Sequence, residues 1–156
     1  MAAARIGVVL VPVDGSEGAR KAVAYAAEIA RALRVPLQML YAFPRNAIEM
    51  FGMPGEAPTQ NQLKYMSEEA FSKLRDDSAR RVFDACRKAI DTDGVTVEET
   101  LLSGPPAEMV MKHAQQANDP VIVVGSRGLS TFGEVLLGSV SQRLVHHAGC
   151  PVTVVR

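Results

Sequence analysis

The sequence has no excess of either charge. Its 17 Lys and Arg residues balance 17 Asp and Glu residues, so the formal net charge at pH 7 is zero. Proteins that bind nucleic acid usually carry a basic surface, and this composition gives no sign of one. We therefore expect no nucleic-acid partner.

Cysteine is scarce, and long apolar runs are absent. The two cysteines, Cys86 and Cys150, have no metal-ligand spacing with the paired histidines near the C-terminus, and we expect both to be reduced thiols. The apolar run at residues 6–13 is interrupted by a proline and is much shorter than the ~20 residues of a transmembrane helix. These features predict a cytoplasmic protein without membrane insertion.

Two familiar nucleotide-binding motifs are also missing. No G-x-x-x-x-G-K-[ST] segment supplies a P-loop lysine, and no G-x-G-x-x-G follows the first apolar run. A nucleotide site in this chain must therefore be built from other residues.

The sequence does contain a regular alternation of apolar runs and amphipathic segments. Strands are predicted at residues 6–13, 36–43, 95–102, 121–125 and 151–156. Helices are predicted at 17–33, with Ser16 as N-cap, and at 62–91, 106–117 and 140–148. Strands that alternate with helices form a parallel sheet with right-handed crossovers. We therefore predict one doubly wound α/β domain over residues 1–156, with helices on both faces of the sheet.

Residues 44–62 show no periodicity and are rich in proline and glycine, which predicts a long loop. The loop contains the apolar residues Ile48, Met50, Phe51 and Met53. These side chains could cover a ligand or contact a partner protein, or they could fold back on the core. The sequence leaves these alternatives open.

A glycine-rich segment, GSRGLSTFGEVLLGS, follows the fourth predicted strand directly. Gly125, Gly128 and Gly138 would let the backbone approach a phosphate chain, and Arg127 could add a charged hydrogen bond. The same glycines could also serve only to turn the chain.

The segment SVSQ at 139–142 has the pattern of a capping box, which predicts a helix with Ser139 as its N-cap. Free N–H groups at the start of such a helix attract anions, and the hydroxyls of Ser139 and Ser141 would add donors. Ligands of open α/β sheets lie beyond the carboxyl ends of the strands. If the first and fourth strands are neighbours, Asp14 and Gly125 face the same crevice.

The spacing Gly125-x2-Gly128-x9-Gly138-Ser139 resembles the G-x2-G-x9-G-[ST] signature of the ATP-binding branch of the universal stress protein family. The similarity includes VLVPVDGSEGARKAV near the N-terminus and LLGSVSQRLVHHAGCPVTVVR at the C-terminus. The resemblance implies a Rossmann-like sheet of order 3-2-1-4-5, of the adenine nucleotide alpha hydrolase-like type. It also implies that ATP, or ADP or AMP, binds together with Mg²⁺ at the topological switch point, the place between the first and fourth strands where the winding of the sheet reverses.

The resemblance further implies which residues meet the nucleotide. The adenine end would lie against the ends of the first two strands, at Pro12, Asp14 and Ala42. The ribose and phosphates would lie against the glycine loop and the following helix, at Val124, Gly125, Gly128, Gly138, Ser139, Val140 and Ser141. Arg127 occupies a position that varies in the family, and its role is inferred from its charge alone.

Members of the family usually form homodimers through the last strand, here 151–156, whose apolar edge would be hidden by antiparallel pairing with a second copy. Phosphoryl transfer needs positioned acids, and the loop itself offers only Glu134, so we expect slow or negligible hydrolysis. The first hypothesis is a cytoplasmic stress-response protein that acts as a nucleotide-dependent dimeric regulator. The alternatives are a slow metal-dependent ATPase or phosphotransferase, and a nucleotide-free dimeric module that binds an unknown protein partner through 44–62.

Overall fold

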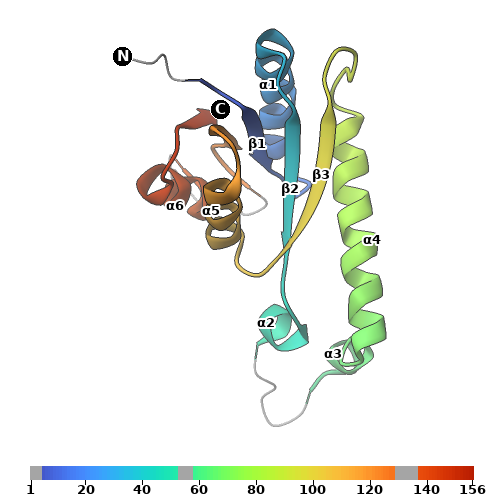
Figure 1. The fold of residues 1–156 in the computed structure, drawn as a ribbon. Helices are drawn as coiled ribbons and strands as arrows, with labels where there is room; N and C mark the ends of the chain where they lie inside the picture. Colours follow the sequence, from blue (N-terminus) through green and yellow to red (C-terminus); the bar gives the residue numbers. More distant parts are fainter. Residues whose placement is uncertain (1–4, 53–57, 129–136) are drawn as a thin grey trace.

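Five parallel strands form one sheet in the computed structural model, which describes residues 5–52, 58–128 and 137–156 (Figure 1). Their bounds are β1 Val8–Pro12, β2 Leu37–Phe43, β3 Val97–Ser103, β4 Pro120–Gly125 and β5 Val152–Val155. Their order is β3-β2-β1-β4-β5, and each neighbouring pair is parallel. This topology confirms the predicted fold class and places β5 at an edge of the sheet.

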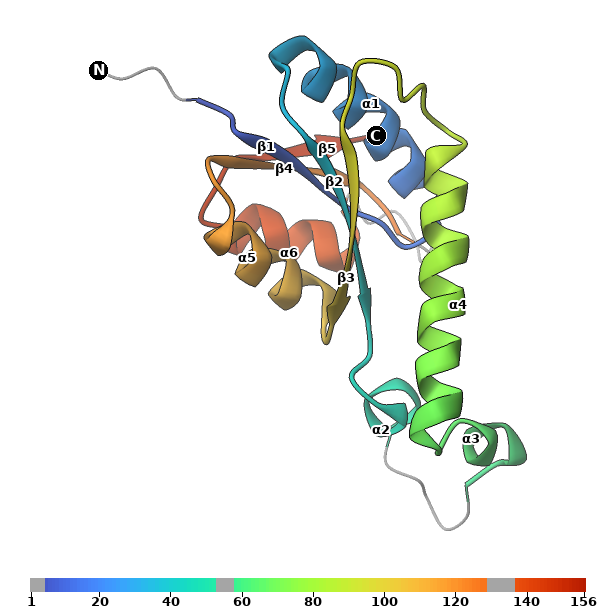
Figure 2. The same ribbon diagram turned by 45° about the vertical axis from the view of Figure 1, so that its right-hand side comes forward.

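Helices cover both faces of the sheet (Figure 2). α1 (Glu17–Leu33) and α4 (Glu68–Arg87) pack on one face, and α5 (Pro106–Gln116) and α6 (Ser139–His147) pack on the other. Because β1 and β4 are covered on both sides, almost all of their side chains are buried, as a continuous apolar run predicts. β1 and β4 therefore lie side by side in the interior of the sheet, with helices on both faces.

α1 begins and ends at the predicted residues, and its N-terminus has the predicted cap. The hydroxyl of Ser16 accepts a hydrogen bond from the N–H of Ala19, at 3.1 Å. The buried face of the helix is made almost entirely of alanine, which lets the helix axis lie close to the sheet. The first turn of α1 is thereby fixed relative to the end of β1.

The predictions for residues 44–91 were wrong in three respects, one of which is that the long helix ends at Arg87 rather than at 91. The segment 44–62 contains two short helices, α2 (Ala47–Phe51) and α3 (Gln60–Lys64), rather than only a loop. The long helix does not begin at 62, because Ser67 caps a new helix by accepting a hydrogen bond from Ala70 N at 3.1 Å. The apolar periodicity continued through this break and concealed it.

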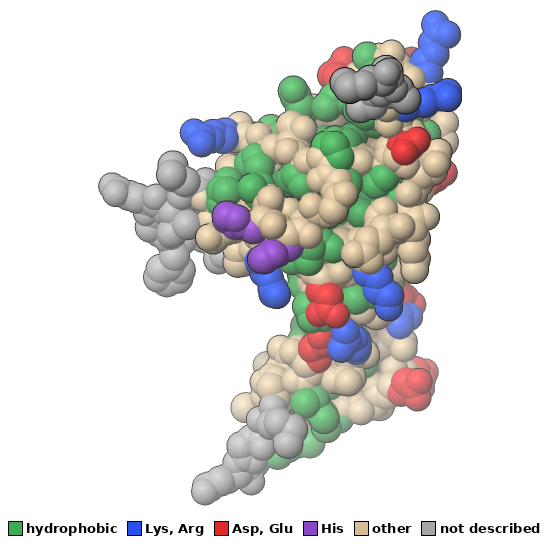
Figure 3. Space-filling view, turned by 60° about the vertical axis from the view of Figure 1, so that its left-hand side comes forward, with side chains coloured by type: hydrophobic (Ala, Val, Ile, Leu, Met, Phe, Trp, Pro, Cys, Tyr) green, Lys and Arg blue, Asp and Glu red, His purple; other side chains and the backbone are tan. Residues whose placement is uncertain are grey.

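The two short helices lie beyond the end of the sheet, beside the N-terminal end of α4 (Figures 1 and 2). The space-filling view shows a hollow between this projection and the main body of the molecule (Figure 3). Ile48 and Met50 of α2 are exposed. Met53, which was predicted to accompany them, lies outside the described residues.

Both cysteines are free thiols, as predicted. Cys86 lies on the buried face of α4, among the residues that pack against the sheet. No helix within the described residues is long and apolar enough to cross a membrane.

Candidate functional site

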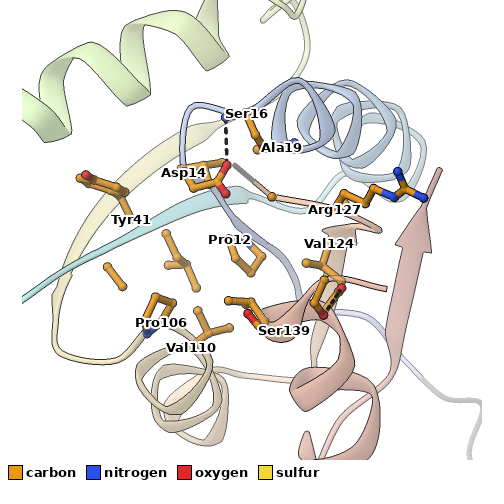
Figure 4. Close-up of a pocket in the computed structure, with 18 residues that line it drawn as sticks. Pro12, Asp14, Ser16, Ala19, Tyr41, Pro106, Val110, Val124, Arg127 and Ser139 are labelled. Atoms are coloured by element: carbon orange, nitrogen blue, oxygen red, sulfur yellow. Dashed lines mark hydrogen bonds between the residues drawn. The ribbon is translucent and has the colours of Figure 1, made fainter. Parts of the chain in front are cut away.

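A cavity of about 280 Å³ opens at the carboxyl ends of the strands, where β1 and β4 lie side by side (Figure 4). Every residue predicted to meet the nucleotide lines this cavity: Pro12, Asp14, Ala42, Val124, Gly125, Arg127, Gly128, Gly138, Ser139, Val140 and Ser141. The cavity is close to the lower end of the ~300–1,000 Å³ that small-molecule sites usually occupy. Segments more than a hundred residues apart in the sequence thus meet at the predicted switch point.

The Asp14 carboxylate lies at the turn between β1 and α1. Its Oδ1 accepts a hydrogen bond from the backbone N–H of Ser16 at 2.9 Å, which fixes the orientation of the side chain (Figure 4). Its other oxygen, Oδ2, lies directly against Gly128, where an added Cβ would be 2.6 Å from it. Asp14 was expected at the adenine end of the site, and the structure places its carboxylate beside the glycine loop.

The glycine loop leaves β4 across the first turn of α1. An added Cβ on Gly125 would lie 2.6 Å from the carbonyl oxygen of Gly18, a separation that Cβ atoms do not tolerate. A glycine at 125 is therefore required by the packing of the chain itself. Gly138 differs, because the nearest described atom to an added Cβ is Arg127 Cα at 3.5 Å.

The start of α6 differs from the predicted capping box. Gly138, not Ser139, is the N-cap residue, and no side chain caps the helix. Gln142 N donates to Gly138 O at 2.9 Å, so the first intrahelical hydrogen bond leaves the N–H groups of Ser139, Val140 and Ser141 ahead of it. Ser139 is exposed, and its hydroxyl has no capping role.

Ser141 has a structural task that the sequence did not reveal. Its hydroxyl is buried and lies 3.2 Å from Ser126 O and 2.9 Å from Gly138 O, so its single proton is shared between two backbone carbonyls. Gly138 N also donates to Ser126 O, at 2.6 Å. These bonds join the two ends of the glycine loop. The Ser141 hydroxyl is therefore not available as a phosphate donor, whereas its N–H remains at the helix start.

The Arg127 side chain does not point into the cavity (Figure 4). Arg127 is exposed, and Figure 4 shows its guanidinium directed away from the other labelled side chains of the cavity. Its backbone, rather than its charge, borders the cavity.

The end of β2 presents a peptide edge to the opposite side of the cavity. Leu40 O accepts from Val13 N at 2.8 Å, and Phe43 O accepts from Gly104 N at 2.9 Å on the other side of the strand. Because peptide groups alternate along a parallel strand, those of Ala42 point to the same side as those of Leu40. β1 has ended at this level, and within the described residues no backbone bond links Ala42 N to Val13. Ala42 therefore offers one donor and one acceptor to the cavity.

Sequence reasoning missed the remaining wall of the cavity, which is mostly apolar: Val13, Ser16, Ala19, Leu40, Tyr41, Pro106 and Val110. Pro106 and Val110 lie one turn apart on α5. Their i, i+4 spacing in the sequence indicates that they share one face of the helix, and this was the signal that could have placed both in the wall. Tyr41 packs edge-on against Phe83, with ring centroids 6.2 Å apart, and burial raises the pKa of its phenol above the ordinary value. The wall suits a flat apolar group.

The described residues include no cluster of three or more His, Cys, Asp or Glu side chains that could hold a metal ion. Glu134, the acid noted in the glycine loop, lies outside the described residues.

The comparisons with known proteins agree with the fold and show its family. The sequence model of the universal stress protein family matches residues 6–156. The chain belongs to the universal stress protein family. Among its relatives in that family, universal stress protein YxiE of Bacillus subtilis is 28% identical over 150 residues, covering 94% of this chain and 97% of YxiE.

Solved universal stress proteins share the fold. The protein UspA from Lactobacillus plantarum is 25% identical with a TM-score of 0.69, covering 99% of this chain and 100% of that chain. A universal stress protein in complex with cAMP is also 25% identical, with a TM-score of 0.63, covering 96% of this chain and 97% of that chain.

Proposed function

We propose that this universal stress protein binds ATP in the cavity at the ends of β1 and β4 and acts as a nucleotide-dependent dimeric regulator in the cytoplasm. The observation that carries the proposal is the uncapped start of α6, which faces a cavity whose far side holds the open peptide edge of Ala42. Free N–H groups at the start of a helix attract anions such as phosphate. An unpaired backbone N–H and C=O can form hydrogen bonds with a nucleobase. The cAMP complex of a related universal stress protein supports an adenine nucleotide as the ligand class.

The base would lie between the apolar wall and the Ala42 peptide. The Watson–Crick edge of adenine carries an acceptor, N1, next to a donor, the N6 amine. Ala42 N–H and C=O can meet that pair, while Pro106 and Val110 cover the ring from the α5 side. Asp14 has an acceptor oxygen, Oδ2, beside Gly128 on the wall of the cavity, where it could accept a hydrogen bond from a ribose hydroxyl.

The phosphates would be held by backbone rather than by charged side chains. The N–H groups of Val140 and Ser141 and the hydroxyl of Ser139 surround the start of α6. Mg²⁺ would be held mainly by the nucleotide phosphates, because the described residues supply no acidic cluster for it. We expect slow or negligible hydrolysis, because Asp14, the one acid among the described residues that line the cavity, already accepts a hydrogen bond from Ser16 N.

The experiment that tests this function is nucleotide release followed by calorimetry. Freshly purified protein is denatured, the supernatant is analysed for nucleotides by ion exchange, and the emptied protein is titrated with ATP and Mg²⁺. Near-stoichiometric adenine nucleotide, or saturable ATP binding, supports the proposal. If neither is found, the ATP site is refuted, and the alternative of a nucleotide-free interaction module replaces it.

A matched pair of charge variants locates the site. Gly138→Asp would place a good N-capping carboxylate at the start of α6, so the helix stays stable while the phosphates are repelled. Gly149→Asp adds the same charge at a position with no atom within 4 Å of an added Cβ. ATP affinity should fall by about a hundredfold or more only in Gly138→Asp, a loss on the scale of two charge-assisted hydrogen bonds.

A further inference from the structure

We propose that Gly18, in the first turn of α1, is a positioning residue that orients the Gly128 N–H toward the phosphates of the bound nucleotide. The inference rests on the proposed nucleotide function. Gly18 is neither in the glycine signature of the loop nor among the residues that line the cavity. Its part in binding is through the backbone of the loop.

The first step is the contact between α1 and the loop. A Cβ on Gly18 would overlap the carbonyl oxygen of Arg127, and a Cβ on Gly125 would lie 2.6 Å from the carbonyl oxygen of Gly18. The two backbones therefore cross with glycine on each side. No other residue type fits at 18 without a shift of the chain.

The second step follows from peptide geometry. A trans peptide directs its C=O and the following N–H to opposite sides. Because the Arg127 carbonyl is directed into the first turn of α1, the Gly128 N–H points away from α1. Gly138 lies beside this peptide, since its added Cβ would be 3.5 Å from both Arg127 Cα and Gly128 N. Gly128 and the first residues of α6 also line the same cavity.

The third step is which backbone would move if Gly18 gained a side chain. α1 is held by the Ser16 cap and by Ala19 and Ala22, which are buried against the sheet. Arg127 is exposed, and its peptide lies after the end of β4, outside any helix or strand. The strain of a Cβ at 18 would therefore rotate or displace the 127–128 peptide, and the Gly128 N–H would lose its direction.

Gly7 provides a matched control. A Cβ on Gly7 would overlap the carbonyl oxygen of Asn118, a steric conflict of the same kind. Gly7 and Asn118 precede β1 and β4, so this contact lies at the amino ends of the strands, opposite the cavity. Gly7→Ala should cost stability without a specific effect on the phosphates.

The test compares ATP with adenosine, which lacks phosphates, by calorimetry on the full chain. Gly18→Ala should weaken ATP binding by about tenfold or more, the effect of one hydrogen bond to a charged group, and leave adenosine binding unchanged. Gly7→Ala should leave the ratio of the two affinities unchanged. An unchanged ratio in Gly18→Ala, whether both affinities are retained or both fall together, overturns the proposal.

A measurement on the wild-type protein keeps the test independent of the folding of the variants. In ¹⁵N amide spectra, ATP should shift the Gly128 resonance strongly, and adenosine should leave it nearly in place. Equal responses to both ligands overturn the role given to this N–H. If wild-type protein binds neither ligand, the proposed function itself fails, which is a separate result from a failure of Gly18.

Discussion

Asp14 and Gly128 lie against each other in the wall of the cavity. Asp14 Oδ2 lies 2.6 Å from the position of an added Cβ on Gly128, while Oδ1 accepts the hydrogen bond of Ser16 N at 2.9 Å. The absence of a side chain at 128 thus allows one carboxylate to fix the β1–α1 turn and to lie beside the glycine loop. The two residues are 114 positions apart in the sequence, and the adjacency of β1 and β4 brings them together.

We predict that Gly128→Ala acts through Asp14. The new methyl group would push the carboxylate aside and break its hydrogen bond to Ser16 N, so the protein should lose about 1 kcal/mol of unfolding free energy. Nucleotide affinity should fall as well. Urea unfolding and ATP titration measure the two effects.

A double-mutant cycle with Asp14→Ala is the control. In the Asp14→Ala background the methyl group at 128 meets no carboxylate, so the stability cost of Gly128→Ala should largely disappear. Additive costs would mean that Asp14 is not the group displaced.

The two serines at the start of α6 should separate stability from binding. Ser141 is buried and its hydroxyl serves two backbone carbonyls, so Ser141→Ala should lower the free energy of unfolding by about 1–2 kcal/mol. Ser139 is exposed and has no capping bond, so Ser139→Ala should leave stability nearly unchanged and weaken ATP binding severalfold. Chemical unfolding and calorimetry on the pair check this. Equal stability losses would contradict it.

The sheet could be predicted from sequence because its signals are local and repeated. Each apolar run is bounded by turn residues, and the helix at 17–33 carries its own N-cap in Ser16. The strand order followed from the resemblance, and from it the meeting of Asp14 with the glycine loop. The predicted residues therefore line one cavity because the strand order brings the ends of β1 and β4 together.

What could not be predicted depends on contacts between distant segments. Nothing in the sequence around Gly18 distinguishes it from the other residues of its helix. Only the close contact between α1 and the Arg127 backbone shows why a glycine is needed at this position. The break before α4 is local but ambiguous, because Leu63 and Met66 continue the apolar period, although both are exposed. Capping by Ser67 decided the start of the helix there.

Stability should fall at alkaline pH because of Cys86. Burial raises the pKa of this thiol to about 11 in the folded protein, while an unfolded cysteine titrates near 8.5. Above pH ~8.5 the unfolded state therefore releases a proton that the folded state retains, and the unfolded state is favoured until the pH reaches the folded pKa. Between pH 8 and pH 10 the contribution of Cys86 to the unfolding free energy should fall by about 1–2 kcal/mol.

The Cys86→Ala variant separates this effect from other titrations, including that of Tyr41, whose pKa is also raised by burial. The variant should be less stable than wild type at pH 8, because it leaves a small cavity, but its unfolding free energy should depend less on pH between 8 and 10. Urea unfolding at the two pH values measures the difference. Parallel pH profiles for the two proteins would exclude Cys86 as the cause.

The proposed homodimer depends on the outer edge of β5. The carbonyls of Pro151 and Val155 accept bonds from Ile122 N and Ser126 N at 2.9 and 2.8 Å, so these residues direct their peptide groups toward β4. By alternation, the N–H and C=O of Val154 point outward and are the groups a second copy would pair with.

Val154→Pro should therefore make the protein monomeric without unfolding it. Proline removes the outward N–H, and it is tolerated on an edge strand where that N–H is not bonded within the sheet. Thr153→Pro is the structural contrast, because its N–H points toward β4 and its loss should destabilise the fold. Val154→Thr keeps the shape and the N–H, and should remain dimeric. Sedimentation velocity measures the mass of each protein. A Val154→Pro variant that folds and still sediments as a dimer would place the interface elsewhere, and a monomeric wild type would remove the dimer from the proposal.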